Sequence, residues 1–324
     1  MPLAASLCPQ AGRERSPRSA RVRGGTAPEA DRMAASFLFS QFMGGLTAAM
    51  FLFLIASGLS LVFGVMRVLN FAHGSFYMLG AYLAWQAVQW LQPAPERFWP
   101  AALFAALGVA ALGAIVERCL LRYLYGREEL YQLLFTYALV LILGDAAKFV
   151  WGTTQLSVSR PPLLAGGIAV FDTIVPVYNL FIMIVGPAIA VAGWLVLSRT
   201  GAGRMVRAAS QDREMLDALG ANVGGIYTGM FVVSSFLAGL SGALVTPIQS
   251  IVPGMDVEII VQAFIVVVIG GLGSFWGTFW GSVIYGQVLS FGILIFPGFS
   301  LFSVFALMVV ILVIRPWGLF GRPL

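Results

Sequence analysis

Long apolar runs separated by short polar connections occupy most of this chain. Nine runs are candidates for membrane-spanning helices, and they cover residues 42–63, 72–91, 99–117, 131–151, 177–197, 228–248, 259–273, 275–296 and 301–314. Most approach the roughly 20 residues that a helix needs to cross a bilayer, and none alternates with the period of two of a barrel strand. The seventh and ninth are short, and only GGLGS at 270–274 divides the seventh from the eighth, so we expect a partial or re-entrant span there. The pattern predicts an all-α polytopic membrane protein with about eight or nine transmembrane helices.

Composition supports a membrane class and argues against an enzyme. The chain is 59% hydrophobic and 10% charged, whereas a soluble domain is nearer a quarter charged. Its sole lysine, Lys148, follows Ala147, so the chain has no Gly-Lys-Ser/Thr phosphate-binding motif and cannot bind ATP in that way. One histidine and the distant Cys8 and Cys119 cannot form a metal site, and we expect no cofactor.

Arginine positions predict how the spans are oriented. If the first span begins outside, the arginines at 67, 118, 122, 127, 199, 204, 207, 213, 315 and 322 fall inside, and only Arg97, Lys148 and Arg160 fall outside. The opposite orientation would contradict the positive-inside rule. This scatter also explains the basic pI of 9.5 without a nucleic-acid partner.

Residues 1–32 depart from this pattern, because they carry six arginines among Pro, Ala, Gly and Ser. They lack the apolar core of a signal peptide, and their composition is typical of disorder. We expect a disordered segment or an upstream extension of the reading frame, with Met33 as the true start and 33–324 as the transmembrane domain. The alternative is a genuine tail held inside, followed by a first segment that does not cross fully.

A polar box, NFAHGSFYMLG at 70–80, lies between the first two runs and holds the chain's sole histidine. Polar groups at membrane depth are costly, so Asn70 and His73, with Gly74 and Tyr77 beside them, need a role. In one interpretation they line or brace a path across the membrane. In the other, Asn70 caps the second helix, His73 binds a neighbouring backbone carbonyl and Gly74 lets another helix approach closely. The predicted orientation puts the box near the inner surface, which favours the second interpretation.

Two other polar features lie near span ends. Asp145 and Lys148 are spaced to form a local ion pair at the outer end of the fourth run, and contact with a zwitterionic substrate is the alternative. The glycine-rich connection either breaks a helix so that backbone groups meet a substrate, or forms a closely packed tight turn. Its candidate residues are Gly270, Gly271, Gly273 and Ser274.

The inner segment at 198–227 contains a predicted helix at 208–219, because strong helix formers follow one another with acids in the early half. Gly220 should end this helix, with Asn222 just beyond it. Met215, Leu216 and Leu219 give it a modest apolar face. Spacing alone leaves two interpretations open: an interfacial helix on lipid headgroups, or a docking helix for a cytosolic partner.

Three stretches together resemble the permease subunits of branched-chain amino acid ABC importers, of the LivH type. They are GLSLVFGVMRVLNFAHGSFYMLGAY at 58–82, the inner segment at 198–227, and VIGGLGSFWGTFWG at 268–281 with RPWGLFG at 315–321. The box NFAHG is highly specific, whereas the glycine-rich stretch is weaker alone. Leu216 departs from the family's usual small residue, and the charges of Asp145 and Lys148 are also unusual.

The resemblance implies a non-catalytic subunit of an importer in the inner (plasma) membrane. Its partners would be a second related permease, two cytosolic ATPases and a periplasmic solute-binding protein. The permease subunits would also contact the lipid bilayer. The residues that match the family's coupling-helix signature are Asp212, Ala218, Leu219, Gly220 and Asn222. Leu216 departs from that signature but is expected to belong to the same ATPase-coupling set.

Substrate and energy source leave alternatives. Similar permeases carry urea or short amides, so the resemblance does not select branched-chain amino acids alone. An ion-gradient-driven carrier would need ionisable residues buried in mid-span, and Asp145 and Glu117 lie toward span ends. On the outer side, Asp256 and Glu258 are expected to be exposed on the face that a binding protein would contact.

Overall fold

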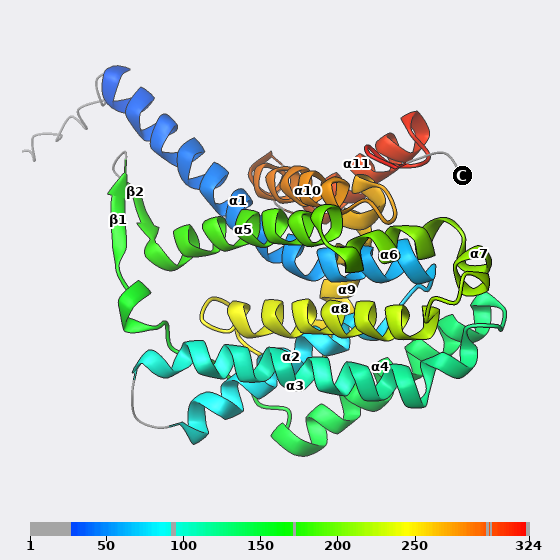
Figure 1. Ribbon diagram of the computed structural model, residues 1–324. Helices are drawn as coiled ribbons and strands as arrows, with labels where there is room; N and C mark the ends of the chain where they lie inside the picture. Colours follow the sequence, from blue (N-terminus) through cyan, green and yellow to red (C-terminus); the bar gives the residue numbers. More distant parts are fainter. Residues whose placement is uncertain (1–26, 92–94, 171–172, 296–297, 299, 322–324) are drawn as a thin grey trace, which may run out of the picture.

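The computed structural model describes residues 27–91, 95–170, 173–295, 298 and 300–321. Helices dominate this part of the chain (Figure 1). Their bounds are α1 Ala27–Met66, α2 Ala72–Trp90, α3 Phe98–Cys119, α4 Glu129–Trp151, α5 Val177–Arg199, α6 Gly201–Gln211, α7 Arg213–Ala218, α8 Val223–Val245, α9 Met255–Gly270, α10 Phe275–Ile295 and α11 Ser300–Ile314. Residues 1–26 and Arg322 lie outside the described residues, and α1 already begins at Ala27, so the extension expected over 1–32 stays a prediction.

The connections are short helical turns and one hairpin. Three 3₁₀ helices, η1 Pro95–Arg97, η2 Leu121–Leu124 and η3 Pro162–Leu164, join the longer helices. Strands β1 Gly167–Val170 and β2 Thr173–Pro176 pair antiparallel within the segment expected to be an outer loop. Within the described ranges the regular structure is therefore helical apart from this hairpin, which the all-α prediction omitted.

Five helices of the described chain are long and apolar enough to cross a membrane: α1 from Ala34 onward, α3, α4, α5 and α8. The helices α9 and α10 pass the same test together but are bent by 116° at their junction, which confirms the broken or re-entrant pair expected there. The apolar part of α11 is shorter, and α2 is not among the helices that pass the test. The described residues thus provide five candidate spans, or six if the bent pair counts as one, and the predicted eight or nine would also require α2 and α11.

The predicted inner and outer segments separate to opposite ends of the bundle. In Figure 1 the hairpin lies at the left end, whereas α6, α7 and the C-terminus lie at the right end. Leu156 and Ile251 bridge two outer connections through backbone hydrogen bonds of 3.0 and 2.8 Å. Thr173 donates to the backbone oxygen of Ser36, which places the hairpin beside the start of the first span. This separation agrees with the orientation inferred from the arginines.

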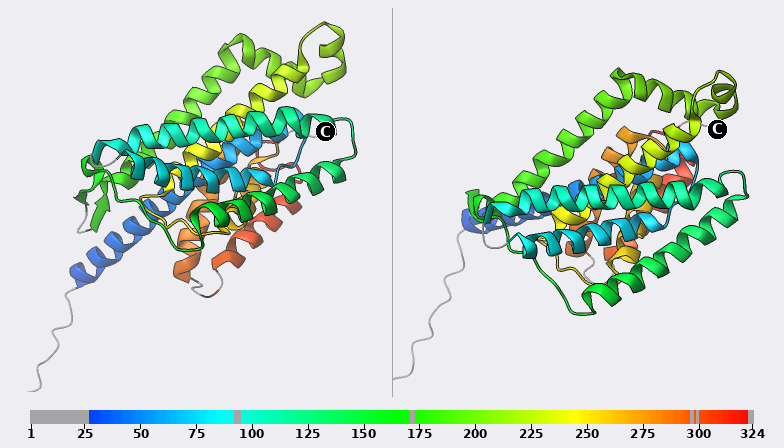
Figure 2. Two further views of the ribbon diagram at one scale, coloured as in Figure 1. Left: turned by 90° about the horizontal axis from the view of Figure 1, so that it is seen from below. Right: turned by 60° about the horizontal axis from the view of Figure 1, so that its bottom comes forward.

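Burial distinguishes central helices from peripheral ones. The most apolar window of α1 is 78% buried and that of α8 is 67% buried, against 22% for α4 and 17% for α5. Figure 2 shows α4 and α5 along opposite edges of the bundle in its right-hand view. Small residues let the central helices approach closely: a side chain at Gly242 of α8 would overlap the backbone oxygen of Tyr77 in α2. The polar box therefore lies against the core, and the inner loops surround one end of it.

Candidate functional site

His73 joins three central helices at the start of α2. Its side chain is 1% exposed, and Nε2 lies 2.9 Å from the backbone oxygen of Ile55 in α1. Nδ1 lies 3.4 Å from the hydroxyl of Ser234 in α8, which donates to the oxygen of Gly58 at 2.8 Å. These contacts hold the ring between α1 and α8, and the backbone-carbonyl bond is the one that the sequence suggested.

The capping role expected of Asn70 is wrong. The residue before α2 is Phe71, which provides no side-chain cap, and no described group bonds to the amide of Asn70. That amide is buried, with the residue 1% exposed. Only its backbone oxygen serves the helix start, by accepting from the backbone N–H of His73 at 3.3 Å. Arg67 lies in the left-handed region with a φ of 53° and turns the chain just before the box. The Asn70 side chain lies in the core after this turn.

Gly74 provides the close helix approach that the sequence predicted. A Cβ there would overlap the backbone oxygen of Asp256, at the start of α9. The neighbouring Ser75 donates to the carboxylate of Asp256 at 2.9 Å. Asp256 is 3% exposed, so the expectation that it lies exposed on the outer face is wrong, because the start of α9 packs into α2. Glu258 is exposed, as expected.

Tyr77 lies one turn further along α2 and lines a small cavity. The cavity measures about 90 Å³, and its wall includes Gln249, Glu258 and Gln262. Gln262 donates to Glu258 at 3.2 Å. Polar groups thus gather where α9 begins, on a side of the helix that the described chain leaves partly open.

Asp145 and Lys148 form the expected local ion pair at 3.0 Å. Both side chains remain largely exposed on the peripheral helix α4, with exposed fractions of 79% and 49%. No other described residue bridges them, and their position is remote from the box. The pair satisfies itself locally.

The glycine-rich connection is a tight turn packed against the end of the chain. Gly271 and Gly273 adopt φ values of 104° and 78°, which side chains rarely tolerate. The hydroxyl of Ser274 accepts from the N–H of Gly277 at 3.1 Å and so begins α10. Phe320 donates its N–H to the oxygen of Gly270 at 3.0 Å. The two sequence stretches at 268–281 and 315–321 are therefore one structural unit.

The inner segment at 198–227 is two helices, so the single helix predicted at 208–219 is wrong. Asp212 separates α6 from α7 with an extended backbone at φ −147° and ψ 102°. Its carboxylate accepts from the backbone N–H of Met215 at 2.9 Å and caps α7. Aspartate competes for backbone groups in this way, which favours a cap over a helix interior. Thr200 caps α6 in the same manner through Gly203.

The end of α7 matches the prediction. Gly220 has a φ of 79° and donates to the oxygen of Asp217 at 2.9 Å, while Ala221 donates to Leu216 at 3.3 Å. This pair of bonds is the Schellman arrangement that favours glycine after a helix. Asn222 then caps α8 by accepting from Gly225 at 2.9 Å. The predicted stop and restart thus fix the direction of the chain between α7 and α8.

The apolar side chains of α7 divide between two surfaces. Leu216 is partly buried and packs against the core cluster formed by α1, α2, α3 and α8. Met215 and Leu219 are 60% and 76% exposed, and Ala218 is exposed beside them. The unusual leucine at 216 therefore anchors α7 to the bundle, and the other apolar residues remain available to a partner.

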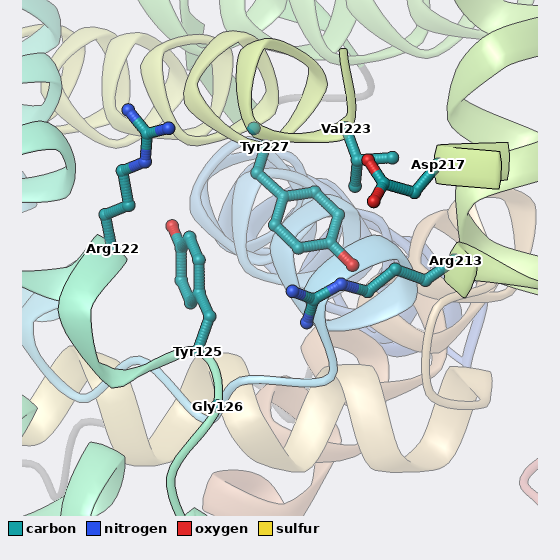
Figure 3. Close-up of a pocket in the computed structure, with 8 residues that line it drawn as sticks. Arg122, Tyr125, Gly126, Arg213, Asp217, Val223 and Tyr227 are labelled. Atoms are coloured by element: carbon teal, nitrogen blue, oxygen red, sulfur yellow. The ribbon is translucent and has the colours of Figure 1, made fainter. Parts of the chain in front are cut away.

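A cavity of about 270 Å³ opens between α7, the start of α8 and the connection from α3 to α4. Figure 3 shows Arg213 reaching beneath the ring of Tyr227, with Tyr125 beside it and Arg122 beyond. The Arg213 guanidinium lies 5.6 Å from the Tyr227 ring centre, and the two tyrosine rings meet edge to face at 5.4 Å. Asp217 also lines the cavity.

Glu117 is a buried carboxylate behind this cavity whose partners the sequence did not reveal. It is 0% exposed, and its two oxygens accept from Tyr125 at 2.7 Å and from Thr228 at 2.6 Å. Burial, followed by the bond to Glu117, raises the pKa of Tyr125 well above its usual range. The network ties the α3–α4 connection to the first turns of α8. Sequence inspection could flag Glu117 only as an ionisable residue at a span end.

No group of metal-ligating side chains occurs among the described residues. Five long apolar helices, a bent helix pair and a capped two-helix inner loop together define a polytopic membrane protein. The family model described as "Branched-chain amino acid transport system / permease component" matches residues 41–314. The chain belongs to this family. The expected location, a multi-pass protein of the inner membrane, is confirmed by the spans and the family.

Named relatives cover nearly the whole chain. The "High-affinity branched-chain amino acid transport system permease protein BraD" of Pseudomonas aeruginosa is 28% identical over 87% of this chain and 95% of its own length. The corresponding LivH protein of Escherichia coli K12 is 28% identical over 90% of this chain and 98% of its own. A "probable" LivH of Methanocaldococcus jannaschii is 28% identical over 72% of this chain. No solved structure matches the chain.

Proposed function

We propose that this permease imports branched-chain amino acids, powered by ATP hydrolysis in separate subunits. Family membership and near full-length similarity to BraD and LivH support the substrate class. The proposed complex contains a second related permease, two cytosolic ATPases and a periplasmic solute-binding protein. The exposed faces of the peripheral helices α4 and α5 are available to such a second membrane subunit.

The observation that carries the coupling role is the shape of α7. The side chains of Asp212 and Asn222 cap the starts of α7 and α8, and a backbone bond of Gly220 ends α7. Leu216 anchors α7 to the core. Leu219 is 76% exposed at its tip. A short helix held rigidly at both ends and anchored on one side can transmit a push from a partner directly to α8.

The motion of α8 would reach the polar box through His73. Ser234 of α8 contacts both His73 and the oxygen of Gly58 in α1. In this proposal Asn70, His73 and Gly74 brace the moving helices, and the turn at Gly270, Gly271, Gly273 and Ser274 forms their inner hinge. Substrate contact is proposed instead for the cavity of Tyr77 and Glu258, whose polar wall is unsuited to face lipid.

The coupling proposal is tested by changing the exposed tip of α7. Leu219→Glu should abolish co-purification of the ATPase and ATP-driven uptake, because a charge replaces the apolar contact without altering packing. Leu163→Glu is the matched control, since Leu163 is 83% exposed in the outer connection. Normal ATPase binding by Leu219→Glu in folded protein would exclude α7 as the contact.

The substrate is tested by reconstituting the complex in proteoliposomes with its own binding protein. Leucine, isoleucine or valine should be accumulated only with ATP present. Accumulation of urea or short amides in their place would favour the alternative substrate class. Uptake driven by an ion gradient without any ATPase would refute the importer mechanism.

A further inference from the structure

Two arginines of the 270 Å³ cavity form no ion pair with any acidic residue that the structure describes. Arg122 comes from η2 and Arg213 from α7, and the ion pair found within the described residues joins Lys148 to Asp145 instead. Asp217 shares the wall but lies beyond ion-pair distance of both guanidinium groups. Two cations therefore face the cavity against one carboxylate. Guanidinium groups bind phosphate and carboxylate oxygens through paired N–H donors.

The walls of the cavity hold these cations in place. Tyr227 is 5% exposed, and its ring supports the guanidinium of Arg213 at 5.6 Å. The Arg122 side chain extends toward Gly224, the second residue of α8. The Tyr125 hydroxyl is already engaged by Glu117, so it holds the wall and is not available to a ligand. The cavity wall thus carries two guanidinium groups that come from different elements, η2 and α7.

The position of the cavity matches the headgroup region of the inner leaflet. It lies between the end of α3 at Cys119 and the start of α8 at Val223, on the side with most arginines. Exposed aromatic side chains surround this level, with Tyr123 77% and Tyr131 56% exposed. Tyrosines favour the membrane–water interface, and basic pockets between helices on the cytoplasmic side suit anionic lipid headgroups.

We propose that Arg122 and Arg213 bind the phosphate of an anionic phospholipid from the inner leaflet. The bound headgroup joins α7 to the α3–α4 connection and so stiffens the coupling segment. The lipid site rests on the proposed function only in so far as α7 is called the coupling segment. Binding of the headgroup itself requires only that the cavity lies on the cytoplasmic side of the membrane. Failure of import and failure of lipid binding are therefore separate results.

The test measures lipid retained by the purified full chain. Wild-type protein extracted in mild detergent and supplied with short-chain phosphatidylglycerol should retain it in native mass spectrometry and melt at a higher temperature. Arg122→Gln/Arg213→Gln should weaken retention at least tenfold, because each lost charge-assisted contact is worth about a factor of ten. Arg127→Gln is the matched control: this arginine is exposed in the same connection but does not line the cavity.

Further arms separate the sources of phosphate and guard against misfolding. Phosphatidylcholine and inorganic phosphate should leave the melting temperature unchanged. If the double glutamine variant does not fold, Arg122→Lys and Arg213→Lys keep the charge but lose the fork, and each should reduce retention. Equal retention by wild type and variants, or an equal response to inorganic phosphate, would overturn the proposal. So would loss of ATPase binding in the variants without any change in lipid retention.

Discussion

Thr228→Val isolates one bond of the buried carboxylate at the inner end of α3. The Thr228 hydroxyl lies 2.6 Å from Glu117, as a donor, and 3.0 Å from the backbone oxygen of Gly224, and Tyr125 donates to the other carboxylate oxygen at 2.7 Å. Valine has nearly the shape of threonine, so the substitution removes the hydroxyl and leaves the packing intact. One oxygen of a carboxylate that is 0% exposed then loses its partner.

The expected loss follows from the cost of removing a hydrogen bond to a charged group. Such a bond contributes about 1.5–3 kcal/mol to the free energy of unfolding, more than a bond between neutral groups. The added methyl group regains less than about 0.8 kcal/mol of apolar burial. Chains of 150–250 residues lose about 2–4 °C of melting temperature for each kcal/mol, so we expect a decrease of several degrees.

Thermal unfolding of the purified permease in one detergent provides the assay. Thr228→Ser keeps the hydroxyl and should melt close to wild type. Tyr125→Phe should lose a comparable amount, and the double variant Thr228→Val/Tyr125→Phe should be non-additive because both bonds serve one carboxylate. A Thr228→Val protein that melts like wild type, or a serine control that loses as much as valine, would refute the network.

Three other outcomes are expected. Gly242→Ala should destabilise the protein by more than about 2 kcal/mol in the same melting assay, because its Cβ would overlap the backbone of α2, whereas Gly229→Ala in the same helix meets nothing within 4 Å and should be neutral or stabilising. His73→Leu should lower stability by about 1 kcal/mol through loss of the bond to Ile55 while leaving the KM for uptake unchanged; a raised KM would instead indicate a role in the path. Because folding raises the pKa of Tyr125, the stability that this hydroxyl contributes should be complete below the ordinary tyrosine pKa of about 10 and be lost at higher pH. The difference in melting temperature between wild type and Tyr125→Phe should therefore stay constant from pH 6 to 9 and become smaller above about pH 10. A difference that already becomes smaller near neutral pH would contradict this assignment.

Local features of the inner loop were predictable, but its division was not. Gly220 ends α7 in the predicted manner, because glycine has no Cβ and therefore tolerates the positive φ that this helix end requires. The residues on both sides of Asp212 are good helix formers, so composition alone favoured one continuous helix. Its cap to Met215 became visible only in three dimensions, where α6 and α7 must turn to pack against the bundle.

At the polar box, the kind of hydrogen-bond partner was predictable from the sequence, but the particular partner was not. A bond from His73 to a backbone carbonyl could be anticipated, because a buried imidazole needs a partner. Which carbonyl it meets, and why Asn70 has none, depends on how α1, α2 and α8 cross. The burial of Asp256 against Ser75 likewise joins residues 181 positions apart.

By itself, the sequence determined the membrane class and the broken helix at 270–274, its motifs indicated the family, and its arginines predict the orientation of the spans. Each of these depends on a local property: apolar length, charge near a span end, or a glycine without a Cβ. Only the tertiary structure decided that Glu117 serves Tyr125 and Thr228, that Leu216 faces inward, and that Arg122 and Arg213 share one cavity. The long-range pairings depend on helix crossing geometry, because lipid selects apolar surfaces without specifying which helices meet, and Glu117 and Thr228 lie 111 positions apart.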